Sequence, residues 1–324
     1  MKELKKLAVG TVVLASLVSL LFLSSESRTA LDRSLRFCVE TLIPSVFPFA
    51  VLGSLAGSDL VRFPHFVTSL VSKMFKIDEG YSKVIILGMI FGFPTGISGA
   101  RALPVISEKN IRDYRFTSVI TCAPGIAFTV LGVGKGLLGS TFTGQLIYVS
   151  NLLSVIIVGI ILSRIERSKD DPWLSKTISD EDKSKKGIAD VLCNSVAKTG
   201  GAMLTMCAFV IFFSQISLLL STLGEHLSFP YEVSLIIDLL LEAGGGTYQA
   251  SRLGGTLGTV LSCFAISWGG ISMQLQTLSL SFEKKVCLRF GYLAVVRFIT
   301  ALISSLICFV FVLACTYFKI CSFL

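Results

Sequence analysis

Long apolar stretches alternate with short polar ones along most of this chain. Each apolar stretch has about 20 residues, the length of α-helix needed to cross a hydrocarbon core about 30 Å thick. The alternating pattern of outer-membrane barrel strands is not found in any of them. We therefore predict helices in nine segments: 7–23, 37–60, 84–103, 116–137, 142–162, 191–220, 233–253, 257–280 and 286–317.

Composition supports a membrane protein. Hydrophobic residues make up 52% of the chain and charged residues 15%, with a mean hydropathy of +0.77, well above the values of soluble domains. The prediction is an all-α polytopic membrane protein. The first stretch, 7–23, is short enough for a signal peptide, but no A-x-A cleavage site follows it directly, so we expect a retained helix.

The chain contains an internal repeat. Residues 81–103 match residues 231–253 at a constant offset of 150, and CAPGI at 122–126 matches SWGGI at 267–271 at an offset of 145. Chance similarity of apolar segments is the alternative, but the breaks also recur in the same order. We predict an N-terminal transmembrane helix (1–30), a first repeat (31–165), a cytoplasmic charged linker (166–189) and a second repeat (190–324).

The charge distribution predicts the topology. If the glycine-rich segments 84–103 and 233–253 are re-entrant hairpins, each repeat has three crossings and the second repeat is inverted. The cytoplasmic regions then hold 21 of the 29 Lys and Arg residues, as the positive-inside rule requires. Irregular backbone at membrane depth must be buried in protein or line a wet cavity. Two such segments in inverted halves indicate a transporter's solute site.

Ionisable residues inside apolar segments are candidates for function. Asp238 and Glu242 are four residues apart and share a helix face, and an intramembrane charge costs roughly 2.5 to 3.5 kcal/mol. We expect them to couple a cation, either a proton or sodium. The alternative is a packing role, paired with Lys198 or Arg297. Arg297, midway along the last apolar segment, is our candidate partner for an anionic solute or counter-ion to Glu242.

Small polar residues flank the predicted breaks, where half-helix N-termini present free N–H groups to carboxylates or phosphates. Close helix packing is the alternative, because Gly88, Gly92 and Gly96 are spaced by four. Tyr248 and Gln276 lie in the same segments. The selected solute-binding residues are Thr95, Ser98, Thr121, Pro124, Thr247, Gln249, Ser267, Ser272 and Gln274, together with Arg297.

Other functional classes have little support in the sequence. The basic residues lie in loops rather than on one face, which argues against nucleic-acid binding despite a net charge of +8. The nine cysteines form no CxxC pair, so neither a metal site nor a cofactor is expected. A GxGxxG pattern at 134–139 follows a predicted transmembrane helix instead of a strand. No catalytic constellation is visible, and we do not expect an enzyme.

Four short motifs carry a family resemblance: LIPSVFPFAVL at 42–52, GFPTGISGAR at 92–101, the proline of CAPG at Pro124, and SWGGISMQLQ at 267–276. Over residues 31–313 the chain resembles the gate-domain (nucleoside recognition domain) membrane proteins, and within them the YlbJ-type sporulation integral membrane proteins of spore-forming bacteria. The family has paired asparagines before the proline, where this chain has Ile-Thr-Cys at 120–122.

The resemblance implies alternating-access transport of a small organic anion similar to dipicolinic acid, in a membrane that surrounds the forespore. In this hypothesis the hairpin tips and broken helices bind the solute, Arg297 neutralises its charge, and Glu242 couples a cation. A nucleoside transporter of the same group and a non-transporting membrane scaffold in sporulation are the alternatives. The sequence leaves the oligomeric state open, a homo-oligomer included.

Overall fold

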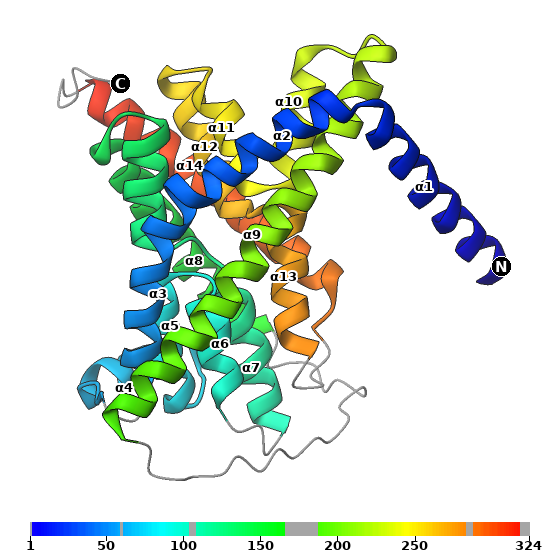
Figure 1. Cartoon of the computed structure of the whole chain (residues 1–324). Coiled ribbons are helices and arrows are strands. Elements are labelled where there is room, and N and C mark those ends of the chain that lie inside the picture. Colours follow the sequence, from blue (N-terminus) through cyan, green and yellow to red (C-terminus); the bar gives the residue numbers. More distant parts are fainter. Residues whose placement is uncertain (1, 59–60, 104–107, 166–186, 283–287, 318–324) are drawn as a thin grey trace.

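The computed structural model describes residues 2–58, 61–103, 108–165, 187–282 and 288–317, which form helices and no strand (Figure 1). The first half contains α1 (Lys2–Phe22), α2 (Ser24–Arg36), η1 (Phe37–Leu42), α3 (Ile43–Gly57), α4 (His65–Phe75), α5 (Glu79–Phe91), α6 (Thr95–Ala102), α7 (Glu108–Ile120), η2 (Phe128–Leu137) and α8 (Thr141–Ile165). The second half contains α9 (Ile188–His226), α10 (Tyr231–Leu241), α11 (Ala243–Ser251), α12 (Gly255–Trp268), α13 (Gly270–Phe282) and α14 (Phe290–Tyr317).

Five helices of the described chain are long and apolar enough to cross a membrane: Ser24–Gly57, Thr141–Ile165, Ile188–His226, Gly255–Ser281 and Phe290–Tyr317. The predicted all-α polytopic membrane fold is confirmed. Two predicted crossings contain shorter apolar helices, Val13–Phe22 within α1 and Phe128–Leu137 in the broken pair α7–η2.

The first long crossing is a continuous helix made of α2, η1 and α3. Its middle is π-helical, and the N–H of Ile43 donates to the carbonyl of Cys38, five residues earlier. Pro44 follows and has no N–H, so the α-helical hydrogen-bond ladder is interrupted here in any case. The π-helical segment directs Phe37 and Leu42 to the centre of the molecule.

Both glycine-rich segments form helical hairpins, as predicted. α5 packs against α6 and α10 against α11, and none of the four helices exceeds 13 residues. A helix of that length spans about 20 Å, less than the hydrocarbon core of a bilayer. In Figure 1 the α5–α6 hairpin rises from the lower end of the molecule and the α10–α11 hairpin descends from the upper end.

Polar contacts fix the base of the first hairpin at the lower end. The hydroxyl of Tyr81 in α5 donates to the carbonyl of Asn110 in α7 at 3.1 Å. The guanidinium of Arg112 donates to the carbonyl of Lys76 at 3.2 Å. The start of α5 therefore lies beside the start of α7, and the chain enters and leaves the hairpin at the same end.

Buried side chains concentrate beside this hairpin. The ring of Phe75 in α4 packs on that of Phe116 in α7, with centroids 5.6 Å apart. Ile85 of α5 and Val155 of α8 belong to the same cluster. This packing stabilises the lower half of the bundle and does not include the residues of the hairpin turn.

The two repeat offsets relate positions that have equivalent places in the two halves. The offset of 150 pairs Gly92 with Glu242, and each follows the first helix of a hairpin. The offset of 145 pairs Gly125 with Gly270, and each lies at a break in the following broken helix. The shared order of hairpin, broken helix and long helix agrees with an inverted repeat, which itself stays a prediction.

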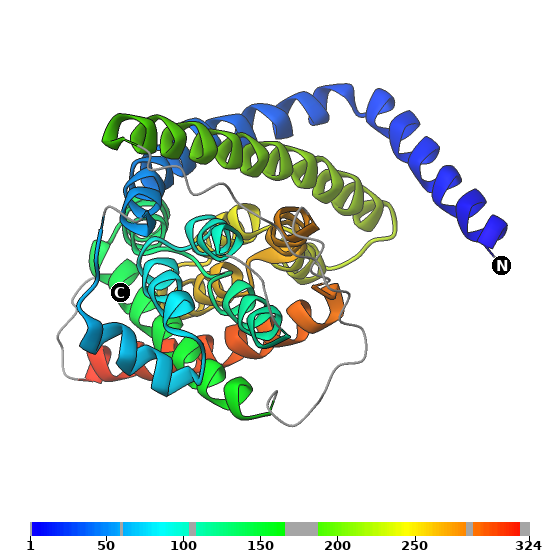
Figure 2. The same cartoon turned by 90° about the horizontal axis from the view of Figure 1, so that it is seen from below.

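An outer layer formed by α2 and α9 covers one flank, where the two helices lie side by side (Figures 1 and 2). α1 projects away from this layer, and its described apolar side chains are largely exposed. The predicted boundary at residue 30 falls within α2. Nearly all of the predicted charged linker, 166–189, lies outside the described residues.

Candidate functional site

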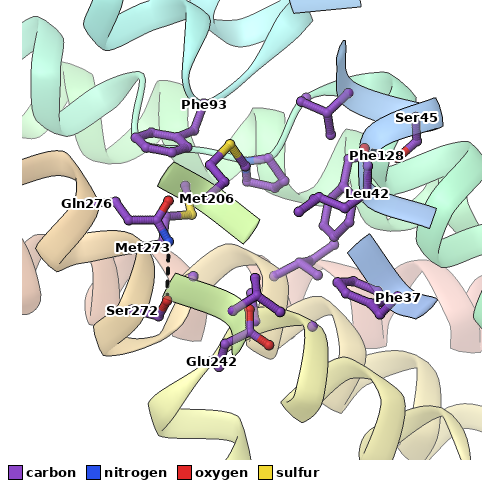
Figure 3. A pocket seen from close by; sticks show the side chains of 18 of the residues that line it. Phe37, Leu42, Ser45, Phe93, Phe128, Met206, Glu242, Ser272, Met273 and Gln276 are labelled. Atoms are coloured by element: carbon purple, nitrogen blue, oxygen red, sulfur yellow. Dashed lines mark hydrogen bonds between the residues drawn. The ribbon is translucent and has the colours of Figure 1, made fainter. Parts of the chain in front are cut away.

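A cavity of about 60 Å³, the inner cavity, lies at the centre of the molecule (Figure 3). All four irregular segments contribute to its lining: the two hairpin turns, the break between α7 and η2, and the break between α12 and α13. η1, α3 and α9 complete its walls. Irregular backbone thus surrounds a cavity, which is the setting in which such backbone is tolerated inside a membrane.

The turn of the first hairpin is seated on the break after α7. The N–H of Phe93 donates to the carbonyl of Ala123 at 2.8 Å. Gly92 has a φ of +74°, which favours glycine, and a Cβ at this position would lie 2.1 Å from the nitrogen of Gly125. A Cβ on Gly125 would lie 2.1 Å from the carbonyl oxygen of Phe91. Here main chain touches main chain, and a side chain does not fit.

The turn of the second hairpin is seated on the break after α12 in the same way. A Cβ on Gly270, whose φ is +71°, would lie 2.6 Å from the carbonyl oxygen of Leu241. The indole Nε1 of Trp268 donates to the carbonyl of Leu240 at 3.0 Å. In both halves a glycine of the broken helix therefore permits the close approach of the hairpin turn.

The walls of the inner cavity are mainly apolar, with side chains from both halves: Phe37, Phe91, Phe93, Phe128, Met206 and Met273. Its polar side chains are Ser45, Glu242, Ser272 and Gln276, so the lining has one acid and no base. The amide nitrogen of Gln276 donates to the hydroxyl of Ser272 at 3.2 Å (Figure 3). The amide oxygen of Gln276 is buried without a hydrogen-bond partner.

Glu242 connects the two helices of the second hairpin. Its backbone is extended, with φ −148° and ψ 133°, and the N–H of Gly245 donates to its Oε2 at 2.6 Å. The carboxylate is thus the N-cap of α11, where the helix dipole favours negative charge. Among the described residues Glu242 has no salt bridge, and Figure 3 shows its carboxylate at the edge of the inner cavity.

A larger cavity of about 550 Å³, the vestibule, adjoins the inner cavity. It lies between α2, α9, α10 and α11 and reaches the turn between α9 and α10 at the upper end of Figure 1. The two cavities share Phe37, Val210, Glu242 and Gly244. Glu242 therefore stands at the boundary between them.

The wall of the vestibule contains Asp238, which is 8% exposed. The hydroxyl of Ser217 in α9 donates to its Oδ1, and Nε2 of Gln249 in α11 donates to its Oδ2 at 3.2 Å. Arg33 lies over the ring of Tyr248, 5.9 Å from the centroid, on the same wall. Asp238 thus links α10 to α9 and α11 while facing the vestibule.

The structure brings some of the predicted solute-binding residues to the cavities. Pro124 and Ser272 line the inner cavity, and Gln249 lines the vestibule. Thr95, the first residue of α6, is buried and its hydroxyl has no partner, but it lines neither cavity. Ser98 is exposed on α6 and also lies outside both.

Three other predicted residues have packing roles in the structure. The hydroxyl of Thr121 donates to the carbonyl of Thr117 at 2.7 Å, and the Thr121 side chain fills the space left by glycines of α5 and α6. The hydroxyl of Thr247 donates to the carbonyl of Ala243 at 2.5 Å. Ser267 donates to the hydroxyl of Ser304 at 2.9 Å, between α12 and α14.

Arg297 is 1% exposed and lines neither cavity. Its guanidinium donates to the carbonyl of Ser267 near the C-terminus of α12, where the helix dipole favours a cation. Its Nε has no partner. The structure therefore does not join Arg297 to Glu242. Gln274 is also fully buried outside both cavities.

Sequence reasoning named Gln276 among the polar residues of the broken helices but did not select it, and it did not select the aromatic walls. On α13 the residues that line the inner cavity are Ser272, Met273 and Gln276, spaced as one helix face. A count of four residues from Ser272 leads to Gln276, whereas Gln274 falls on another face. The helical spacing of four residues from Ser272 could therefore have predicted that Gln276 lines the cavity.

Comparison with protein-family models, with curated proteins and with solved structures finds no match. Among the described residues, no group of three or more His, Cys, Asp or Glu side chains is placed to hold a metal ion. The two cavities are therefore the features of the described structure that bear on function.

Proposed function

We propose that this chain transports a small organic solute across a membrane by alternating access. The observation that supports this most strongly is the meeting of two helical hairpins and two helix breaks around one central cavity. Broken helices at the midplane are the usual place of solute sites in transporters with repeated halves.

The sizes of the two cavities fit one state of an alternating-access cycle. Ligand sites commonly have volumes of 300 to 1,000 Å³. The vestibule falls in this range, with about 550 Å³, and the inner cavity, with about 60 Å³, falls below it. In the proposed cycle the solute enters from the vestibule, and the hairpin turns separate to admit it.

An ionised Glu242 would require a coupling cation if the solute is an anion. Two like charges about 5 Å apart repel by about 3 kcal/mol at an effective dielectric constant of 20. An anion of the dipicolinate type would therefore bind after Glu242 is protonated or paired with sodium. Glu242 is the proposed coupling residue, and Asp238 in the vestibule wall is proposed as a second coupling acid. Arg297 lies outside both cavities and has no part in this scheme.

A nucleoside is the second candidate solute, and the phenylalanines of the inner cavity favour it as much as an aromatic acid. Rings of both kinds are flat and suit stacking against Phe37, Phe93 or Phe128. A membrane that surrounds the forespore, and a non-transporting scaffold role there, have the family resemblance as their only support.

Reconstituted protein would test the proposal. Proteoliposomes with the full chain are loaded with dipicolinate, uridine or an amino acid, and uptake of the labelled solute is followed with and without a proton or sodium gradient. We expect saturable uptake of a planar solute, driven by one gradient. Absence of uptake and exchange for every solute class, from correctly folded protein, would favour the scaffold role.

A further inference from the structure

The polar groups on the inner cavity wall differ in whether they still lack a hydrogen-bond partner. Gln276 is 4% exposed, and its amide nitrogen donates to the hydroxyl of Ser272. Its amide oxygen is buried, has no partner and belongs to a side chain that lines the cavity. Figure 3 shows this oxygen directed away from Ser272. A buried polar atom without a partner costs free energy, which a ligand that hydrogen-bonds to it recovers.

Glu242 adds a second acceptor at the edge of the same cavity. One carboxylate oxygen takes the N–H of Gly245, and the lining contains no Lys, Arg or His side chain to balance the charge. Of the two serines in the lining, Ser45 already donates to the carbonyl of Thr41 at 2.5 Å, and Ser272 accepts the hydrogen bond from Gln276. The polar side-chain groups open to a solute thus include two acceptors, the Gln276 amide oxygen and the Glu242 carboxylate, besides the Ser272 hydroxyl.

The remaining walls define the shape of the solute. Phe93 and Met273 lie next to Gln276 and Ser272, and Phe37 and Phe128 lie across the cavity (Figure 3). Phenyl rings and a thioether favour a flat aromatic ring between them. The amide oxygen of Gln276 would then meet the edge of that ring, where N–H or O–H groups project.

We propose that Gln276 is the specificity-determining residue of the inner cavity and that its free amide oxygen selects planar aromatic solutes that donate a hydrogen bond. This inference rests on the proposed function and names the class of solute. It requires the hairpin turns to separate, because the inner cavity is smaller than an aromatic ring with substituents. The hydrogen bond between Gln276 and Ser272 lies within α13, so a movement of the turns need not break it.

Two neutral planar probes test the inference. Uracil has two ring N–H donors, and 1,3-dimethyluracil has the same flat ring and no donor. We expect the purified full-length protein to bind uracil at least tenfold more tightly, by thermal-shift titration in detergent, because one hydrogen bond to a buried partner discriminates by about that factor. Equal binding, tighter binding of 1,3-dimethyluracil, or no binding of either probe would overturn the inference.

Variants of Gln276 locate the discrimination. Gln276→Met removes the acceptor at similar length and should abolish the preference for uracil. Gln276→Glu keeps an acceptor and supplies no amide N–H, so the preference for the neutral uracil should persist at pH 8. Gln274→Met is the matched control on the same helix, since Gln274 is buried outside the cavity, and it should leave the ratio unchanged.

The outcomes separate this inference from the transport proposal. If Gln276→Glu loses uracil binding while Gln276→Met keeps it, the side chain does not act as an acceptor and the inference is wrong. Gradient-driven flux of any solute in proteoliposomes would still support transport in that case. Absence of all flux in the wild-type protein, with uracil still bound selectively, would overturn the transport proposal instead.

Discussion

Replacement of Glu242 by glutamine tests the proposed coupling role. The change keeps the shape of the side chain and one acceptor oxygen, so the hydrogen bond from the N–H of Gly245 can remain. It removes the charge and the group that can be protonated. We expect uptake driven by a cation gradient to be lost, while exchange of solute across the membrane continues.

The contacts of Glu242 set the expected loss of stability. Its carboxylate caps α11, and a neutral acceptor gives up only the charge–dipole part of that interaction, about 0.3 to 1 kcal/mol. Breaking a buried ion pair would cost 3 to 5 kcal/mol. The smaller value applies, because none of the salt bridges among the described residues includes Glu242.

Flux and melting temperature should be measured on the same preparation of Glu242→Gln. Glu232→Gln is the matched control, since Glu232 is an exposed acid at the start of α10 and lines neither cavity. Normal gradient-driven flux with a loss of several kcal/mol in stability would refute the reasoning. Glu242 would then be a packing residue with an ionic partner outside the described chain.

Three further experiments test the geometry. Gly125→Ala places a Cβ against the carbonyl of Phe91 and should destabilise the protein by about 1 to 3 kcal/mol in chemical denaturation. Gly136→Ala is the control and should be neutral, because the atom nearest to its Cβ would be 3.5 Å away. Equal effects of the two substitutions would contradict the close contact between the first hairpin turn and the break after α7. In a cysteine-free background, Lys76→Cys should react with a membrane-impermeant maleimide added on the cytoplasmic side, and Arg252→Cys should react when it is added outside. Reaction of both cysteines from the same side would contradict hairpins that enter from opposite ends of the molecule. Arg297→Met should change the half-saturation concentration for uptake less than twofold, and a tenfold rise would restore Arg297 as the partner of an anionic solute.

The breaks in the sequence were sufficient to predict the hairpins. Glycine and proline interrupt apolar segments that are otherwise long enough to cross, and the positive-inside rule disfavours a full crossing at 84–103. The two offsets also paired Gly92 with Glu242 and Gly125 with Gly270. The structure adds that the members of each half, Gly92 with Gly125 and Glu242 with Gly270, are in contact.

The identity of the cavity lining was less predictable, because it depends on the rotation of each helix. Polar residue types selected Ser98 and Gln274, which lie on faces of α6 and α13 that do not reach the cavity. Arg297 was expected to face a solute or Glu242, but the carbonyl of Ser267 takes its guanidinium. Burial in an apolar segment does not indicate which neighbour satisfies a charge, and a main-chain carbonyl at a helix end is as suitable as an acid.

The difference between contacts within and between the halves indicates where the protein opens. Within each half, the hairpin turn touches its broken helix through main-chain atoms, and Phe93 and Ala123 form a hydrogen bond that separation would break. Between the halves, the inner cavity is lined by side chains such as Phe93 and Met273, and the unbranched thioether of Met273 adapts readily to a change in its surroundings. Each hairpin should therefore move together with its own broken helix. In the proposed cycle the cavity would open along the line between the halves, and Glu242, which borders both cavities, would exchange a coupling cation through the vestibule before Gln276 meets the solute.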